Sequence, residues 1–387
     1  MKVRLMNKIS QEGLKRLPAD RYEVGEDLDH ADAIMVRSAS LHDAAFELEL
    51  KCIARAGAGV NNIPLDRCSE QGIVVFNTPG GNSNAVKELT IAGLLLASRK
   101  IVKGIEWVKT LDPEGIAKAV EKGKSQFAGP EIAGKKLGVI GLGAIGVQVA
   151  NAAAALGMDV YGYDPYISVR AAWTLKARIH HISELKTIFE ECDYITLHLP
   201  LMDSTRGMLN EEAFAQMKDD VRIVNFARDA LVDEDALAAA IAQGKVAAYV
   251  TDFASPKLIA LDQVIITPHL GASTPESEDN CARMAANEIR DYLEWGNIRN
   301  SVNMPELALN PSARNRICII NRNVPNMVAK IASKLGECGI NIENMANKAR
   351  GNHAYTIVET NDTIDQAAIE EIRRSEGIIR VRVIHFA

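Results

Sequence analysis

One glycine-rich run, residues 136–146, restricts the fold of this chain more than any other feature. Residues 137–140 are apolar and predict a buried strand, and the alanine-rich residues 147–156 predict a helix. Between them, Gly141 permits a tight turn, Gly143 lets a ligand approach the backbone, and Gly146 lets the helix pack closely on the strand. Because a helix N-terminus attracts negative charge, this strand–turn–helix unit predicts a site for the pyrophosphate of a dinucleotide.

A carboxylate follows where a nucleotide-binding unit needs one. Gly157 ends the predicted helix, residues 159–163 predict the next strand, and Asp164 comes directly after that strand. A carboxylate there accepts hydrogen bonds from ribose hydroxyls and repels the 2′-phosphate of NADP. Residues 165–167 supply no cation to reverse this preference, so the sequence predicts NAD as the cofactor. If the glycines served only a tight turn, Asp164 would be a solvated strand end.

Composition narrows the class of protein and of partner. The chain has 387 residues, more than one hydrophobic core usually covers, which predicts two or three domains. Its formal net charge of −6 argues against a nucleic-acid surface, so local arginines must hold any anionic substrate. No apolar segment is long enough to span a bilayer, and the N-terminus lacks a secretory signal, so we expect a cytoplasmic protein without a membrane partner. The six cysteines form no CxxC pair, which predicts reduced thiols and no metal site.

The order of predicted elements indicates an α/β fold in three parts. Residues 1–97, with about 283–310, predict a discontinuous flavodoxin-like α/β substrate domain. Residues 98–282 predict a doubly wound parallel-sheet (Rossmann) domain that binds NAD. A polar connection that ends at Gly134 leads into its sheet. After Ala272 the sequence predicts a long helix that ends at Gly296. Residues 300–315 predict a linker, and residues 316–387 predict a ferredoxin-like βαββαβ unit whose second strand starts near residue 340.

Two polar side chains follow predicted strands at the edge where open α/β sheets bind ligands. Arg228 comes after the strand at residues 221–225, and His269 lies between the strand at residues 264–266 and the long helix. A guanidinium can hold a carboxylate through two hydrogen bonds, and an imidazole can move a proton near neutral pH. The pair therefore suits oxidation of a 2-hydroxy acid. Structural roles stay open for both, with Arg228 paired to Asp233 and His269 at a helix entry.

Five segments resemble the D-isomer-specific 2-hydroxyacid dehydrogenases, in the order in which that family carries them. They are residues 55–61, 77–83, 136–146, 225–234 and 267–273, and residues 323–325 and 339–342 are similar to ACT domains. The resemblance implies that His269 takes the hydroxyl proton, that Arg228 holds the carboxylate, and that Asp252 contacts the nicotinamide amide.

The resemblance also implies which residues line each site. The implied cofactor residues are Gly141, Gly143, Ala144, Ile145, Gly146, Asp164, Leu199, Pro200, Phe226, Ala227, Asp252, Gly271 and Ala272. The implied substrate residues, of which the two arginines are candidates for a phosphate group, are Arg37, Ser38, Arg55, Gly57, Asn77, Gly81 and Asn82. The residues implied to face an amino-acid effector such as L-serine, between paired ACT domains of a homo-oligomer (dimer or tetramer), are Asn321, Asn323 and Asn341.

The chain departs from the family at positions that bear on chemistry. Ser255 stands where the family usually carries a glutamate that partners the histidine, and Asp229 or Glu278 could supply that carboxylate instead. Ala144 stands where arginine is frequent. Asn326 stands where glycine would follow the proline of the ACT loop. The C-terminal segment could therefore have lost its ligand, and a role in oligomerisation alone stays open.

The resemblance therefore implies an NAD-dependent enzyme that oxidises a small phosphorylated 2-hydroxy acid. Two alternatives stay open: a reductase of the hydroxypyruvate or glyoxylate type, and an NAD-responsive regulatory protein on the same fold. His198 is expected to line the cofactor site or to be structural, and His180 and His181 are expected on a solvated strand edge.

Overall fold

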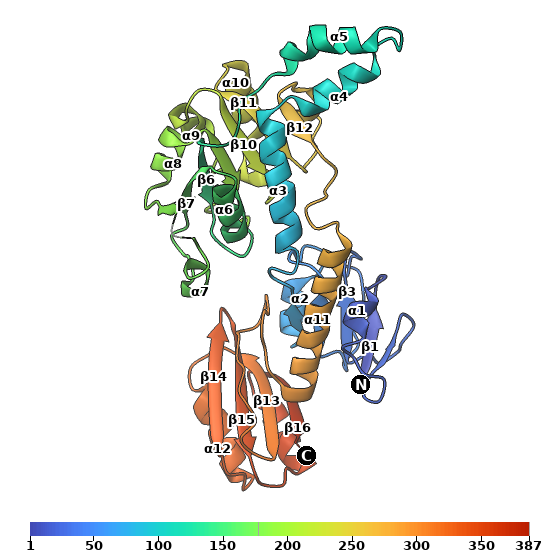
Figure 1. Cartoon of the computed structure of the whole chain (residues 1–387). Coiled ribbons are helices and arrows are strands. Elements are labelled where there is room, and N and C mark those ends of the chain that lie inside the picture. Colours follow the sequence, from blue (N-terminus) through green and yellow to red (C-terminus); the bar gives the residue numbers. More distant parts are fainter. Residues whose placement is uncertain (177, 387) are drawn as a thin grey trace. The chain divides into compact units, whose positions relative to one another are not determined.

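The computed structural model describes residues 1–176 and 178–386, which fall into two compact units (Figure 1). Unit 1 is Met1–Asn82 with Glu278–Ala387, and unit 2 is Ser83–Ser277. Within the described ranges, no helix is both long and apolar enough to cross a membrane.

Unit 2 is built on a seven-stranded parallel sheet. Its strands are β6 (Lys136–Ile140), β7 (Asp159–Tyr163), β8 (Ile179–His181), β9 (Tyr194–Leu197), β10 (Val221–Asn225), β11 (Val246–Thr251) and β12 (Val264–Ile266). They lie in the order β12-β11-β10-β9-β6-β7-β8, and every neighbouring pair is parallel. The order reverses between β6 and β9, where such sheets bind their ligands. The expected Rossmann-like parallel sheet is confirmed.

Helices cover both faces of this sheet. They are α3 (Ser83–Ser98), α6 (Gly146–Ala155), α8 (Leu185–Glu191), α9 (Glu211–Gln216) and α10 (Glu234–Ala242), with a short α7 (Val169–Ala172). Alternate strand residues enter two different cores: Val139 packs with α3 and α6, and Ile140 packs with α8, α9 and α10. Burial on both faces explains why the strands read as nearly continuous apolar runs.

Two features of unit 2 differ from the expectations. The first domain was expected to end at residue 97, but α3 buries Val86 and Leu94 in the core of unit 2, so the division falls between Asn82 and Ser83. The expected polar connection contains α4 (Ile101–Lys109), α5 (Ile116–Gly123) and a 3-10 turn, Lys124–Phe127. These helices leave the end of α3 and bury none of their own residues (Figure 1).

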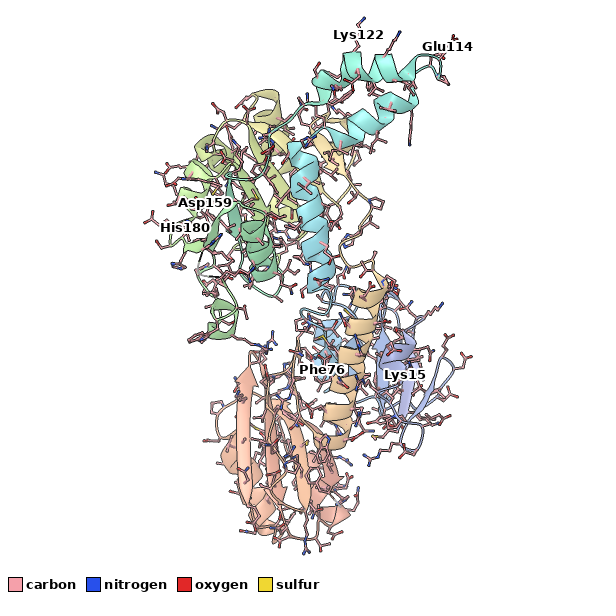
Figure 2. The ribbon with its side chains drawn as sticks, in the orientation of Figure 1. Lys15, Phe76, Glu114, Lys122, Asp159 and His180 are labelled. Atoms are coloured by element: carbon pink, nitrogen blue, oxygen red, sulfur yellow. The ribbon has the colours of Figure 1, made fainter. Side chains whose placement is uncertain are left out.

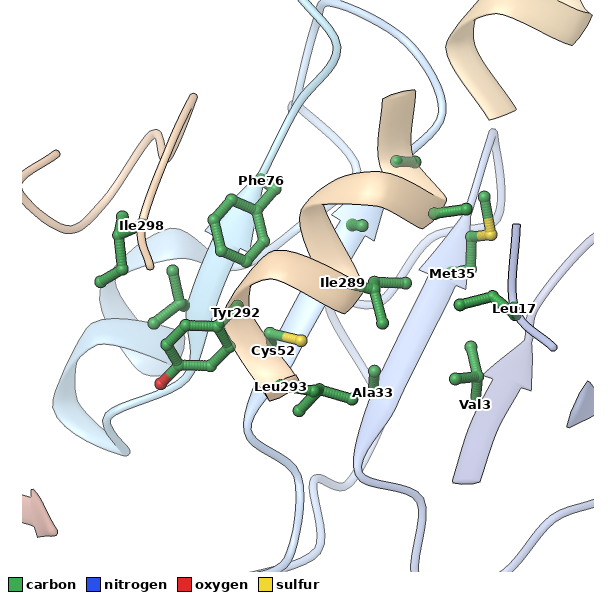
Figure 3. Close-up of a cluster of buried hydrophobic side chains, with 14 of the residues drawn as sticks. Val3, Leu17, Ala33, Met35, Cys52, Phe76, Ile289, Tyr292, Leu293 and Ile298 are labelled. Atoms are coloured by element: carbon green, nitrogen blue, oxygen red, sulfur yellow. The ribbon is translucent and has the colours of Figure 1, made fainter. Parts of the chain in front are cut away.

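The N-terminal part of unit 1 contains a five-stranded parallel sheet. Its strands are β1 (Lys2–Leu5), β2 (Glu23–Gly25), β3 (Ala33–Val36), β4 (Cys52–Arg55) and β5 (Val74–Phe76), with α1 (Gln11–Leu14) and α2 (Leu65–Glu70) between them. The order β2-β1-β3-β4-β5 is that of flavodoxin. The predicted long helix is α11 (Pro275–Trp295), and Gly296 follows it with a φ of 69°. Figure 3 shows Ile289 and Tyr292 of α11 among the side chains of this sheet, including Met35, Cys52 and Phe76.

The C-terminal part of unit 1 is a four-stranded antiparallel sheet with two helices. Its elements are β13 (Asn315–Arg322), α12 (Met327–Glu337), β14 (Asn344–Arg350), β15 (His353–Thr360), α13 (Gln366–Arg373) and β16 (Ile378–His385). The predicted βαββαβ order is thus present, with the strands in the order β14-β15-β13-β16. Ile317 and Ile319 pack with α12 and α13, whereas Cys318 and Ile320 join the core that contains α11. Alternation along β13 therefore binds this sheet to the N-terminal part.

Candidate active site

The glycine turn of unit 2 has the geometry that its sequence predicts. Gly141 follows β6 with a φ of 93°, a conformation that disfavours any side chain. A Cβ atom on Gly146 would lie 1.8 Å from the carbonyl oxygen of Gly141, so only glycine fits at the start of α6. A Cβ atom on Gly143 would meet nothing within 4 Å. Gly143 is therefore free of any packing requirement inside the protein, as expected if its role is to admit a ligand.

Asp164 lies at the end of β7 and closes the glycine turn. Its Oδ2 accepts a hydrogen bond from the backbone N–H of Leu142 at 2.9 Å, and its Oδ1 accepts one from Tyr166 at 2.8 Å. Each oxygen keeps a further lone pair for a hydroxyl donor. Across the described residues, Asp164 forms no ion pair, so no cation masks its negative charge.

Arg228 follows β10 in an extended conformation, as predicted, and its side chain is exposed. The buried side chain of Asn225 fixes the loop, because its Nδ2 donates to the carbonyl oxygen of Arg228 at 2.8 Å and its Oδ1 accepts from the N–H of Ala227 at 3.1 Å. The guanidinium donates through Nη1 to the carbonyl oxygen of Ala227 at 2.5 Å. No ion pair with Asp233 forms, since Asp233 caps α10 instead. These contacts leave other guanidinium donors available to a carboxylate.

His269 lies in the loop after β12 and is exposed. Its ring packs edge-on against Phe253, with ring centroids 5.3 Å apart. Asp252, the neighbour of Phe253, is 4 % exposed; its Oδ2 accepts the N–H of Gly271 at 3.2 Å, and its Oδ1 has no partner among the described residues. Burial raises the pKa of Asp252, and the charge of His269 opposes that rise. Asp252 is therefore a carboxylate close enough to interact with the imidazole.

The carboxylates expected to replace the family glutamate are engaged elsewhere. Glu278 pairs with Arg37 at 2.7 Å, and Oδ1 of Asp229 accepts the backbone N–H of Ala230. Ser255, at the glutamate position, donates its hydroxyl to Glu234 at 2.9 Å. The sequence analysis missed Asp252 for this purpose because it assigned that residue to the cofactor alone.

The candidate substrate residues of unit 1 follow β3, β4 and β5. The side-chain oxygen of Asn7, which the sequence analysis missed, accepts the N–H groups of Arg37 at 3.2 Å and Ser38 at 3.0 Å. Nε of Arg55 donates to the carbonyl oxygen of Arg37 at 3.1 Å. Unit 1 thus brings both predicted arginines together, although Arg37 is also the ion-pair partner of Glu278.

Three other candidates lie on the loop after β5. Asn77 is half-buried, Gly81 is buried, and Asn82 is half-buried. A Cβ atom on Gly81 would lie 2.7 Å from Sγ of Cys281, so glycine is required for α11 to pass this loop.

The remaining histidines of unit 2 agree with the sequence analysis. His198 backs the glycine turn, because a Cβ atom on Gly141 would lie 2.5 Å from its carbonyl oxygen. Burial lowers the pKa of His198 to about 3, which keeps its ring neutral. His180 and His181 are exposed on the edge strand β8, and Nε2 of His180 lies 2.8 Å from Oδ1 of Asp159 (Figure 2).

The other predicted cofactor residues lie along one edge of the same sheet. They follow β6, β9, β10 and β12 and are Ala144, Ile145, Leu199, Pro200, Phe226, Ala227, Gly271 and Ala272. The switch between β6 and β9 and the ends of β10 and β12 thus bring these residues to the same edge of the sheet of unit 2.

A second candidate site lies in the C-terminal part of unit 1. A cavity of about 470 Å³ is lined by Asn321 and Asn323, as predicted, and by Asn347, which the sequence analysis missed. Asn341 does not line it; its N–H donates to Asp362 at 2.6 Å, at the other end of α12. Asn326 has a left-handed φ of 67°, which explains why glycine would suit that position.

Comparison with known proteins agrees with this geometry. Residues 91–271 match the family model of the D-isomer specific 2-hydroxyacid dehydrogenase, NAD binding domain. The chain is 39% identical over 296 residues to D-3-phosphoglycerate dehydrogenase of Methanocaldococcus jannaschii, an alignment that covers 74% of this chain and 54% of the relative. The chain thus spans about half the length of the curated relatives that it matches.

Solved structures resemble most of the chain. NAD+-bound 3-phosphoglycerate dehydrogenase of Entamoeba histolytica has a TM-score of 0.61 at 27% identity, covering 79% of this chain and 99% of that one. A glyoxylate reductase from Paecilomyes thermophila has a TM-score of 0.65 at 26% identity, covering 78% of this chain and 98% of that one. Residues 91–271 of this chain thus match the NAD binding domain of the D-isomer specific 2-hydroxyacid dehydrogenases.

Proposed function

We propose that this chain is an NAD-dependent dehydrogenase that oxidises D-3-phosphoglycerate to 3-phosphohydroxypyruvate. The observation that supports it most is the placement of Arg228 and His269 after two strands of the sheet whose glycine turn and Asp164 suit a dinucleotide. The curated relative from Methanocaldococcus jannaschii, which is named D-3-phosphoglycerate dehydrogenase, supports the choice of substrate.

The residues of unit 2 fit NAD. The orphan Oδ1 of Asp252 is a buried acceptor without a donor among the described residues, which suits the amide of a nicotinamide. The carboxylate of Asp164 suits an unphosphorylated ribose, and the N-terminus of α6 suits a pyrophosphate. NAD, when bound, accepts the hydride that leaves C2 of the substrate.

The remaining steps belong to the protein. Arg228 holds the substrate carboxylate and polarises the C2 oxygen through guanidinium donors that the loop at Asn225 fixes in place. His269 takes the hydroxyl proton as the C2 oxygen becomes a carbonyl, and it returns that proton in the reverse direction. Phe253 packs edge-on against the imidazole ring, and the buried carboxylate of Asp252 interacts with the charge of that ring.

We assign the substrate phosphate to Arg55, with Arg37 in support. Arg55 Nε is committed to the backbone of the β3 loop, which orients the guanidinium, whereas Arg37 already shares its charge with Glu278. Steady-state rates with D-3-phosphoglycerate, D-glycerate and D-lactate test this assignment. Arg55→Ala should raise the KM for the phosphorylated acid by at least about tenfold and leave glycerate unaffected. Equal effects on both acids would contradict the assignment.

A second candidate function is reduction of glyoxylate or hydroxypyruvate, which the likeness to the glyoxylate reductase favours. Steady-state rates decide between the two functions. Oxidation is measured with the same three acids, and reduction is measured with glyoxylate and hydroxypyruvate. The first proposal is supported if kcat/KM for the phosphorylated acid exceeds kcat/KM for the unphosphorylated acids by at least about tenfold. A charge-assisted contact between an arginine and the phosphate stabilises the bound substrate enough to give a difference of that size.

We propose that the C-terminal part is an ACT domain that binds L-serine in the cavity lined by Asn321, Asn323 and Asn347. Nδ2 of Asn347 donates to Thr356 at 2.7 Å, and the Oγ1 of Thr356 donates to Asn321 at 3.4 Å, so these polar groups share one network. Asn341 would reach such a ligand only from a second copy of the chain. Calorimetric titration with L-serine tests this: no heat and no change of rate would leave oligomerisation as the tail's role.

A further inference from the structure

The helix α11 buries a glutamate that the proposed chemistry does not use. Glu288 lies in the second half of α11 and is 7 % exposed. Its Oε1 accepts a hydrogen bond from Nδ2 of Asn300 at 2.8 Å, whereas its Oε2 has no partner within residues 1–176 and 178–386. Burial raises the pKa of Glu288 to about 8, and the hydrogen bond from Asn300 opposes this rise only in part. Burial therefore favours the neutral form of this carboxyl group.

Asn300 connects this carboxyl group to the loop after β5. Its φ is 54°, a left-handed conformation that asparagine tolerates better than most residues and that a side-chain hydrogen bond can hold. Its carbonyl oxygen accepts the N–H of Asn77 at 3.3 Å, and the next residue, Ser301, forms an antiparallel bridge with Phe76. Asn77 thus takes its backbone position from the turn that Glu288 holds.

Asn77 passes this restraint to the loop after β4. Its Nδ2 donates to the carbonyl oxygen of Ala58 at 2.5 Å, and the N–H of Thr78 donates to the carbonyl oxygen of Gly57 at 3.1 Å. A Cβ atom on Gly57 would lie 2.5 Å from Nη1 of Arg55, so this backbone lies directly against the guanidinium. Hydrogen bonds therefore connect the buried carboxyl group to two of the three loops that carry candidate substrate residues, those after β5 and β4.

We propose that the neutral carboxyl group of Glu288 is a positioning residue for these substrate loops, and that its ionisation releases the turn at Asn300. This inference rests on the proposed function, because it takes Arg55 and Asn77 as substrate residues. It adds to that function a pH-dependent control of substrate affinity that acts from outside the reacting groups.

The surroundings of Glu288 explain why ionisation would matter. A cavity of about 320 Å³ lies beside it, and the charged residues that line this cavity with it are Asp291, one turn along α11, and Arg299, after the helix. Nε of Arg299 donates to Asp291 at 3.1 Å, so this cation is already engaged. Within the described chain, no ion pair involves Glu288. The hydrogen bond from Asn300 favours the charged form of Glu288, but the cost of burying a negative charge is larger. A negative charge there would therefore draw water into the cavity, and hydration of the carboxylate would compete with its bond to Asn300.

Three variants test the proposal. Glu288→Gln keeps the acceptor for Asn300 but cannot ionise, Glu288→Leu removes the acceptor, and Glu306→Gln removes an exposed glutamate of the same unit as a control. Three quantities are measured between pH 6.5 and 9.5: the KM for D-3-phosphoglycerate, the kcat, and the hydrogen–deuterium exchange of residues 74–82.

We expect the KM of the wild type to rise above pH 8, in parallel with Glu306→Gln, while Glu288→Gln keeps its low KM. Glu288→Leu should raise the KM at least about fivefold at every pH, with kcat and NAD affinity unchanged, because the turn loses a hydrogen bond that the catalytic groups do not share. At pH 9 the amides of residues 77–82 should exchange faster in the wild type than in Glu288→Gln.

The exchange data separate the two proposals. If the acid is not turned over but Glu288→Gln still slows exchange at pH 9, the proposed function fails and the positioning role stands. If Glu288→Gln and the wild type exchange alike and share one pH curve, the positioning role is wrong whatever the activity.

Discussion

At the scale of single residues, two glycines of the same turn have different reasons to be glycine. Gly146 is required by packing, since a Cβ atom would lie 1.8 Å from a carbonyl oxygen, whereas a Cβ atom on Gly143 would meet no atom within 4 Å. The space beside Gly143 is therefore open, as the predicted binding role of this residue requires. A shared sequence motif thus divides into a folding requirement and a binding requirement.

Alanine substitution should separate these requirements. Gly143→Ala should leave the midpoint of thermal unfolding unchanged but raise the Kd for NAD at least about tenfold, because the methyl group enters the path of the pyrophosphate. Gly146→Ala should lower the unfolding midpoint as well, because helix α6 must move off β6. Calorimetry with NAD and thermal unfolding of both variants measure this. Tight NAD binding by Gly143→Ala would contradict the assignment of the turn.

Arg316 and Glu359 form an ion pair in which both side chains are fully buried. Their atoms Nη2 and Oε1 lie 2.6 Å apart, and Arg316 also donates to the carbonyl oxygen of Leu309 at 3.1 Å. Burial raises the pKa of Glu359, but hydrogen bonds from Ser312 and Arg316 outweigh it and lower the pKa overall. The carboxylate is thus held ionised where it joins the C-terminal sheet to the segment after α11.

Removing one partner should be costly. Glu359→Leu should lower the free energy of unfolding by about 3–5 kcal/mol, because it leaves the Arg316 guanidinium buried without a counter-charge. Since the folded-state pKa of Glu359 is lowered, its stabilising contribution is present near neutral pH and is lost as the pH falls below the ordinary range of a glutamate. Urea unfolding at pH 7 and pH 4 measures both effects. The variant should lose more stability at pH 7, and an equal loss at both would contradict this account.

At the scale of elements, the sequence predicted best where one physical signal dominates. The strands β6, β9 and β10 are buried on both faces, so their apolar runs were sufficient to find them. The helix α11 begins at Pro275 and is followed by Gly296 in a left-handed conformation, so sequence signals marked both of its ends. In contrast, β14 begins at Asn344 rather than near residue 340, because most of its side chains are exposed and polar and carry no alternation.

The site was predictable where function follows from position after a strand. Arg228 and His269 are placed by β10 and β12, which periodicity identifies. Asn7, Asn225 and Phe253 were not predictable, because each acts through a contact that the fold creates. The same holds for Glu288, whose burial depends on how α11 meets the segment after it.

At the scale of the whole molecule, the homo-oligomer stays a prediction, and the helices α4 and α5 of unit 2 carry an exposed apolar surface that would suit it. Their exposed apolar side chains are Ile101, Val102, Ile105, Val108 and Ile116, and a surface of this kind is typical of a protein–protein contact. The ring of Trp107 lies 5.1 Å from that of Phe127, so the helices keep their own internal packing.

A charge on this surface should break the assembly without unfolding the chain. Ile105 is 53 % exposed, so Ile105→Glu should reduce the molar mass in solution to that of one chain and leave the unfolding midpoint of unit 2 unchanged. Light scattering after size-exclusion chromatography measures the mass. Glu106→Gln, a neighbouring substitution that removes a charge, is the control. An Ile105→Glu protein of unchanged mass would place the interface elsewhere.

In the proposed reaction, one carbon of a D-2-hydroxy acid loses its hydride to NAD while His269 takes the hydroxyl proton. D-3-Phosphoglycerate carrying deuterium at C2 tests it directly, with the label followed by NMR. We predict deuterium at C4 of the reduced nicotinamide with the wild type, and a rate at least about a hundredfold lower with His269→Asn. Reduced cofactor without the label, or no label transfer with any 2-hydroxy acid supplied, would contradict the account.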